Sequence, residues 1–173
     1  MPVTLRALHP LLRLQDAISR AGLGLGGIAL GLMTVIYAYE ILLRYFMGAP
    51  TSWASDFVSF LLLISVFAVL PWLTREGGNV AVTLLPDYMP ERAGRWLLRA
   101  GFLVSGIACL WVTYIGMQET LLLFERGTMT LTTVRVPKWM FLALISLGLF
   151  LSGLYFFRLA FEAGQATRNT VHA

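Results

Sequence analysis

The sequence predicts an all-α membrane protein with four transmembrane helices, short interfacial amphipathic helices and both termini in the cytoplasm. Hydrophobic residues make up 58% of the 173 residues, whereas charged residues make up only 13%. A soluble domain of this size needs a larger share of polar surface. The apolar residues also gather in four runs, each able to cross the roughly 30 Å hydrocarbon layer, which takes about 20 helical residues.

The four predicted spans cover approximately residues 23–43, 53–73, 98–123 and 136–161. No stretch between them is long enough to form a soluble domain, so we expect a single membrane domain over residues 1–173. No sequence repeat divides the chain. The internal symmetry on which many complete transporters are built is therefore not predicted.

Two segments beside the spans have the pattern of amphipathic helices that lie on the membrane. The first belongs to a cytoplasmic N-terminal segment, residues 1–22, in which apolar residues are interspersed with arginines. Within it Asp16 and Arg20 are four residues apart, which predicts an ion pair on one helix face. The second is residues 90–96, which lead into the third span. A helix that continued from residue 90 through the third span would be about 50 Å long, which is longer than the bilayer is thick. We therefore expect it to protrude, tilt or break.

The distribution of arginine and lysine between the two ends of the spans predicts the orientation in the membrane. Cytoplasmic flanks carry an excess of these residues. Nine lie on the side of the termini and the middle loop, and four lie on the other side. We therefore expect a multi-pass membrane protein, with both termini and the middle loop cytoplasmic.

Ionisable residues collect at the outer ends of the predicted spans, not at mid-membrane depth. Glu40 precedes Arg44 by four residues, which favours a helical ion pair. Asp56 lies in the first turn of the second span, where the helix dipole favours an anion. We interpret these residues first as pairs that fix helix ends; docking of a partner, or binding of a coupling ion or proton, are the alternatives. This outer-rim set consists of Glu40, Arg44, Trp53, Asp56, Glu119, Arg126, Arg135 and Lys138.

Small residues recur at three- or four-residue spacing in three of the spans. Such spacing lets helix backbones approach closely. We expect these positions to pack mainly within the bundle, since stripes of this kind are common wherever membrane helices meet. The candidate packing positions are Gly24, Gly27, Gly31, Gly101, Ser105, Gly148 and Ser152.

The sequence contains no motif for catalysis, for a cofactor or for nucleic acid. Both histidines, His9 and His172, lie outside the spans, which argues against a haem held between histidines in the bundle. The single Cys109 cannot form an intramolecular disulfide. Phosphate-loop, zinc-protease and serine-hydrolase motifs are absent, and the basic residues form no binding stripe. We therefore predict no enzyme activity, no cofactor or metal, and no nucleic-acid partner.

Three short motifs occur in order along the chain. The sequence R-Y-F at 44–46 is followed by Trp53 and Asp56, R-E-G-G at 75–78 follows the second span, and V-P-K-W at 136–139 opens the fourth. Together they resemble the small permease subunit, DctQ-like or Q, of tripartite ATP-independent periplasmic (TRAP) transporters. The resemblance covers about residues 37–159.

The resemblance implies a three-part secondary active transporter. A soluble periplasmic binding protein captures an organic acid, and a large permease subunit moves it with a sodium gradient. The small subunit would be a fixed scaffold, embedded in membrane lipid, against which the large subunit moves. Three positions depart from the family pattern: Ser55 replaces one residue of an acidic pair, and Asn79 and Thr83 stand where histidine and aspartate are common. No role is carried over to these three.

Two other classes of function are compatible with the sequence. One is an autonomous four-span exporter, in which a homodimer uses Glu40 as a shared carboxylate. Its weakness is that Arg44 offers Glu40 a partner near the end of the span. The other is a membrane anchor of a respiratory or quinone-linked enzyme. The lack of histidines within the spans argues only against a version that carries haem.

Overall fold

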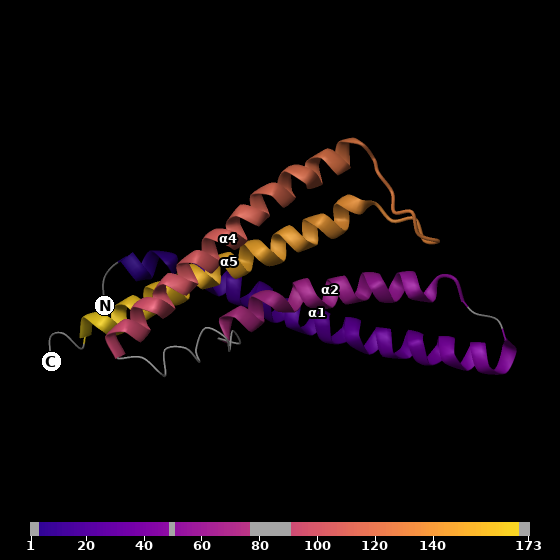
Figure 1. Cartoon of the computed structure of the whole chain (residues 1–173), viewed down its shortest axis with the longest axis horizontal. Helices are drawn as coiled ribbons and strands as arrows, with labels where there is room; N and C mark the ends of the chain where they lie inside the picture. Colours follow the sequence, from indigo (N-terminus) through magenta and orange to yellow (C-terminus); the bar gives the residue numbers. More distant parts are fainter. Residues whose placement is uncertain (1–3, 49–50, 77–90, 170–173) are drawn as a thin grey trace.

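In this computed structural model the described residues are 4–48, 51–76 and 91–169. They form four helices, α1 (Thr4–Met47), α2 (Ala54–Arg75), α4 (Glu91–Glu125) and α5 (Lys138–Asn169) (Figure 1). All four are long and apolar enough to cross a membrane. Within these ranges the only β pairing is an isolated bridge between Met129 and Pro137. The all-α fold with four spanning helices is therefore confirmed.

The spanning segments are Leu12–Met47, Ala54–Arg75, Trp96–Arg126 and Lys138–Phe161. Their ends lie close to the predicted ones except at the start of the first span. There, α1 runs as one helix from Thr4 to Met47, so the amphipathic N-terminal segment is continuous with the first span. Residues 91–96 likewise continue directly into α4, so the predicted alternative of a break in this helix is also wrong.

The N-terminal part of α1 packs against α5 through two of its polar residues. Gln15 is 8% exposed and Ser19 is 1% exposed. The side-chain amide of Gln15 donates a hydrogen bond to the carbonyl oxygen of Leu151 in α5. An interfacial helix would turn such residues to water. The segment is amphipathic, but part of its polar face contacts another helix.

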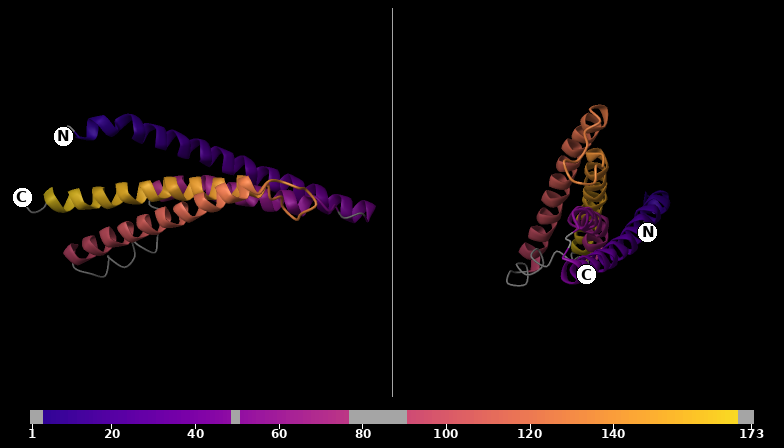
Figure 2. Two further views of the ribbon diagram at one scale, coloured as in Figure 1. Left: turned by 90° about the horizontal axis from the view of Figure 1, so that it is seen from above. Right: turned by 90° about the vertical axis from the view of Figure 1, so that its right-hand side faces the viewer.

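The helices form an open array in the order α1, α2, α5, α4 (Figure 2). Each helix packs on its neighbour in this order, and no comparable contact joins α1 to α4 in the described part of the chain. In Figure 1 the α1–α2 and α4–α5 pairs diverge toward the end where α1 ends and α2 begins. In Figure 2 α1 and α4 lie on opposite sides of α5 near the other end. The fold is therefore not a closed four-helix bundle.

Burial inside the chain differs sharply between the central and the flanking helices. Of the residues in each spanning segment's most apolar window, 39% are buried in α5 but only 6% in α4. Helix α5 lies between α2 and α4, whereas α4 has a neighbour on one side only. Most of the α4 surface is thus left to lipid or to another protein chain.

Helix α5 packs against α2 beside a proline inside α2. Pro71 has no N–H, so the carbonyl oxygen of Phe67, four residues earlier, loses its helical hydrogen bond. Helix α5 approaches this carbonyl at Gly148, where an added Cβ would lie 2.5 Å from the oxygen. Neighbouring helices commonly cover carbonyls freed by proline in membranes. Further along, the rings of Phe60 and Phe141 stack 4.7 Å apart.

Candidate functional site

A group of polar side chains joins α1, α2 and α5 near the end of the molecule where α1 begins and α5 ends. Its centre is the carboxylate of Asp16. One oxygen accepts a 2.8 Å hydrogen bond from the Tyr155 hydroxyl and lies 3.4 Å from Nη1 of Arg158. The other oxygen lies 3.5 Å from Nη2 of Arg75. We call this group the terminal-end cluster; its members are Gln15, Asp16, Ser19, Arg75, Tyr155 and Arg158.

The buried side of the cluster is a chain of hydrogen bonds between α1 and α5. The hydroxyls of Ser19 and Tyr155 lie 3.1 Å apart, and both residues are 1% exposed. Ser19 also donates to the carbonyl oxygen of Gln15. Buried hydroxyls without partners cost free energy, so these bonds favour one register of α1 on α5. The cluster therefore acts first as a junction between three helices.

Two arginines of this region lie over the same tryptophan. The guanidinium carbon of Arg75 is 4.9 Å from the centre of the Trp72 ring, and that of Arg20 is 6.0 Å from it. Both distances fit cation–π contacts. The predicted pair between Asp16 and Arg20 is wrong, because in the described structure Asp16 turns to α2 and α5 and its ion pairs are with Arg75 and Arg158.

The outer-rim set lies toward the opposite end and does not form one site. Its members are divided between the α1–α2 pair and the α4–α5 pair, which diverge there (Figure 1). In the part of the chain that is described, no ion pair within 4 Å joins Glu40 to Arg44, so that predicted pair is absent. Four members on the α4–α5 side are exposed in this chain: Glu119, Arg126, Arg135 and Lys138.

Two members of the outer-rim set do make contacts. Asp56, in the first turn of α2, accepts a 3.3 Å hydrogen bond from the backbone N–H of Val134, in the segment between α4 and α5. This bond connects the two helix pairs where they diverge. The Trp53 ring packs against Phe57, with ring centres 5.7 Å apart, and against Tyr39 of α1. Asp56 therefore links the two helix pairs, whereas Trp53 packs within the α1–α2 pair.

The segment between α4 and α5, residues 126–137, is held by its own hydrogen bonds. The backbone N–H of Thr130 donates a 2.9 Å hydrogen bond to the carbonyl oxygen of Val136. The Thr130 hydroxyl in turn accepts a hydrogen bond from the Val136 N–H. Gly127, with a φ of 58°, begins the turn after α4. This folded segment exposes Leu131 almost completely, at 98%. The folded segment was not predicted from the sequence, in which Gly127 and the threonines that follow it indicate only a turn.

The predicted packing glycines of α1 face away from the other helices. A Cβ added at Gly24, Gly27 or Gly31 would meet nothing within 4 Å. The expectation that they pack inside the bundle is therefore wrong. Gly22 and Gly26 pack against α2 instead, and a Cβ at Gly22 would collide with the Ala68 carbonyl oxygen.

The other packing candidates lie on α4 and α5. Gly148 approaches the Phe67 carbonyl, and Ser152 is 1% exposed. Gly101 and Ser105, in α4, are half-buried. These four positions are thus less exposed than the three glycines of α1.

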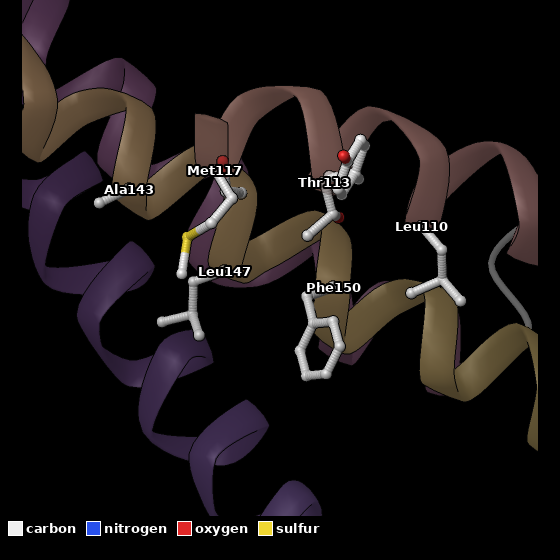
Figure 3. Close-up of a pocket in the computed structure, with 8 residues that line it drawn as sticks. Leu110, Thr113, Met117, Ala143, Leu147 and Phe150 are labelled. Carbon is white, nitrogen blue, oxygen red and sulfur yellow. The ribbon is translucent and has the colours of Figure 1, made fainter. Parts of the chain in front are cut away.

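A groove of about 620 Å³ lies between α4 and α5 (Figure 3). Its lining consists of Leu110, Thr113, Tyr114, Met117, Ala143, Ser146, Leu147 and Phe150. None of these side chains is charged, so the groove offers no counter-charge to an organic acid anion.

Among the described residues, no three histidine, cysteine, aspartate or glutamate side chains gather as metal ligands. The positions 77, 78, 79 and 83 singled out in the sequence lie outside the described residues.

Comparison with known proteins assigns the chain to a family. A family model described as "Tripartite ATP-independent periplasmic transporters, DctQ component" matches residues 33–165, which include α2, α4 and most of α5. Neither the curated proteins nor the solved structures gave a match. The matched range is more than half of the chain and includes all three motifs from which the resemblance was inferred. The chain therefore belongs to the DctQ family, the small membrane component of TRAP transporters.

Proposed function

We propose that this subunit is a fixed scaffold in a sodium-driven transporter of an organic acid. A large permease subunit would carry the acid and the sodium ions, and a periplasmic binding protein would deliver the acid. One observation carries the scaffold role. The stretches 21–39, 57–74, 100–118 and 139–157, one in each spanning helix, contain no Asp, Glu, Lys or Arg. A site for ions and an anionic solute at mid-membrane depth would ordinarily need such groups or broken helices.

The open array supports the scaffold proposal, because it leaves surfaces to be covered. Helix α1 presents Gly24, Gly27 and Gly31 outward, with nothing within 4 Å of them in this chain. Small residues on a lipid-facing helix permit close approach of another helix. We propose that this face of α1 contacts the large permease subunit. Helix α4, of which few residues are buried, offers a second surface for such a contact.

The orientation is proposed from the charge distribution. Nine of the thirteen arginines and lysines lie on the side of the termini, so this side is proposed to face the cytoplasm of a bacterium. The folded segment 126–137 and the outer-rim set would then face the periplasm. Leu131, exposed at the tip of that segment, and the nearby Arg126 and Arg135 are candidates for contact with the binding protein.

Reconstitution in vesicles tests the proposal. The chain by itself should give no sodium-driven uptake of organic acids, because it lacks the transport site. Uptake should require a large permease encoded beside it and the binding protein. If vesicles containing only this chain accumulated an organic acid when a sodium gradient was applied, the scaffold proposal would be wrong.

One observation keeps the homodimeric exporter as a second candidate. Glu40 makes no ion pair with Arg44 in the described structure, so its carboxylate is not neutralised within the chain in the expected way. An exporter of this kind should appear as a homodimer after purification. Its coupled transport should disappear in Glu40→Gln, whereas the scaffold proposal predicts that the isolated chain transports nothing.

A further inference from the structure

Helix α1 extends past the level at which α2 begins (Figure 1). The ring of Tyr39 lies beside the ring of Trp53, the N-cap residue of α2, with ring centres 6.4 Å apart. At a rise of 1.5 Å per residue, residues 40–47 of α1 continue for about 12 Å beyond this level. They include the R-Y-F motif at 44–46. We call residues 40–47 the α1 extension.

The start of α2 marks the boundary of the hydrocarbon layer at this end of the molecule. The 22 residues of Ala54–Arg75 form a helix about 33 Å long, and the layer that it must cross is roughly 30 Å thick. Because α2 has almost no length to spare, its first residue lies near the boundary. The headgroup layer beyond the boundary is about 5–8 Å thick. The α1 extension therefore reaches through the headgroups and past them.

The α1 extension is largely apolar and is not covered by the described part of the chain. Tyr45 is 89% exposed and Phe46 is 81% exposed, and Met47 is exposed as well. Successive helical residues turn by about 100°, so these three side chains together point to more than half of the circumference of the helix. Exposed apolar surface of this kind marks a contact with another protein or with a membrane.

One exposed face of α1 connects the extension to the part of the helix inside the membrane. Gly31, Ala38 and Tyr45 are seven residues apart, which places them on the same face of a helix, and all three are exposed in this chain. Lipid tails can cover Gly31 and Ala38, but they do not reach Tyr45 beyond the hydrocarbon. A soluble protein can reach Tyr45 but not Gly31. The partner that covers the whole face is therefore embedded in the membrane and also rises above it.

We propose that the α1 extension is a docking surface for the large permease subunit. The proposal rests on the proposed scaffold role and names the place where the scaffold and the permease meet outside the hydrocarbon. The contact follows α1 from Gly31 to Tyr45, a distance of about 21 Å along the helix. Tyrosine and phenylalanine are enriched in the cores of such interfaces, where they bury large areas.

Arg44 adds a charge requirement to this docking surface. It is exposed, and among the described residues it has no ion pair within 4 Å. Interfaces place opposite charges across from each other, which fixes the register of the two partners. The permease surface that fits the α1 extension is therefore apolar opposite Tyr45 and carries an acidic group opposite Arg44.

Photocrosslinking in the complex tests the docking surface. The chain is expressed with the binding protein and with the large permease encoded beside it, and the photoreactive amino acid benzoylphenylalanine replaces Tyr45. Illumination should link the chain to the permease. The same probe in place of Leu131, which is 98% exposed at the same end of the array, is the matched control and should give no product with the permease.

Several results of this experiment would overturn the proposal. One is a product from position 45 with the binding protein, with a second copy of the chain or with lipid in place of the permease. Another is the absence of any product from position 45. Equal amounts of permease product from positions 45 and 131 would show general proximity and would overturn it as well.

Affinity measurements on the purified subunits separate the docking surface from the scaffold role. Tyr45→Ala should weaken binding to the permease about tenfold, an effect typical of truncating an aromatic side chain at an interface. Its own unfolding should not change, because Tyr45 is almost fully exposed in the chain. Leu131→Ala should bind as the unchanged chain does. Full affinity in Tyr45→Ala would overturn the docking surface alone, whereas no association of the unchanged subunits would overturn the scaffold role together with it.

Discussion

Both ends of this helix array carry charged residues, but the helices meet at one end and diverge at the other. Near the termini, α1, α2 and α5 converge, and Asp16, Tyr155 and Arg75 form a partly buried junction. At the other end the helix pairs diverge, and Glu40 and Arg44 make no ion pair in the described structure. Charged residues near helix ends therefore become structural only where helices meet. Elsewhere they are available to lipid, water or a partner subunit.

The largest effect should come from filling the close approach of α1 to α2. Gly22→Leu should destabilise the isolated chain by about 3 kcal/mol, because its side chain would meet a backbone carbonyl that cannot move away. Gly31→Leu, on the open face of the same helix, should be neutral or slightly stabilising, since leucine favours a helix. Unfolding in mixed micelles, followed by circular dichroism, measures both. Equal effects would contradict the assignment of the two faces.

A smaller loss is expected from removing the carboxylate at the junction. Asp16→Ala takes away the shared partner of two arginines and a tyrosine, and should lower the free energy of unfolding by about 2 kcal/mol, less than for a fully buried pair. Glu119→Ala at the exposed outer rim should change it by less than about 0.5 kcal/mol. The same unfolding titration compares the two variants. A loss as large in Glu119→Ala would remove the difference between the ends.

The hydroxyl of Tyr155 should contribute about 1 kcal/mol. Tyr155→Phe keeps the buried ring but leaves Ser19 and Asp16 without this hydrogen-bond partner. Tyr114→Phe is a suitable comparison, because that hydroxyl accepts its hydrogen bond from Gln118 on the exposed surface of α4. It should be close to neutral. A stability change confined to Tyr155→Phe would show that the junction stabilises the array.

The smallest effect is expected at the diverging end. Asp56→Ala removes the acceptor for the Val134 N–H and should cost about 0.5–1 kcal/mol of global stability. Hydrogen exchange should show it more clearly, as faster exchange confined to the segment 126–137. Ser55→Ala, one residue earlier and exposed, serves as the control. Unchanged exchange in Asp56→Ala would mean that this bond does not connect the two pairs.

Much of the fold could be predicted from composition and pattern alone. Four uncharged apolar stretches determine four spanning helices, because lipid leaves the backbone no other way to satisfy its hydrogen bonds within a single segment. The motifs at 44–46, 75–78 and 136–139 were enough to indicate the family. These conclusions depend on local sequence, so they did not require knowledge of which helices touch.

Only the tertiary structure decided which residues on each helix face a neighbour. Gly22 and Gly24 are equally small, yet only Gly22 meets α2, since a helix turns by about 100° per residue and two positions can lie on opposite faces. Asp16 has a suitable partner, Arg20, four residues away in the sequence. Its ion pairs are instead with Arg75 and Arg158, which are more than fifty residues away. The order α1, α2, α5, α4 determined these contacts, and hydropathy carries no information about it, because lipid and helix surfaces are similarly apolar.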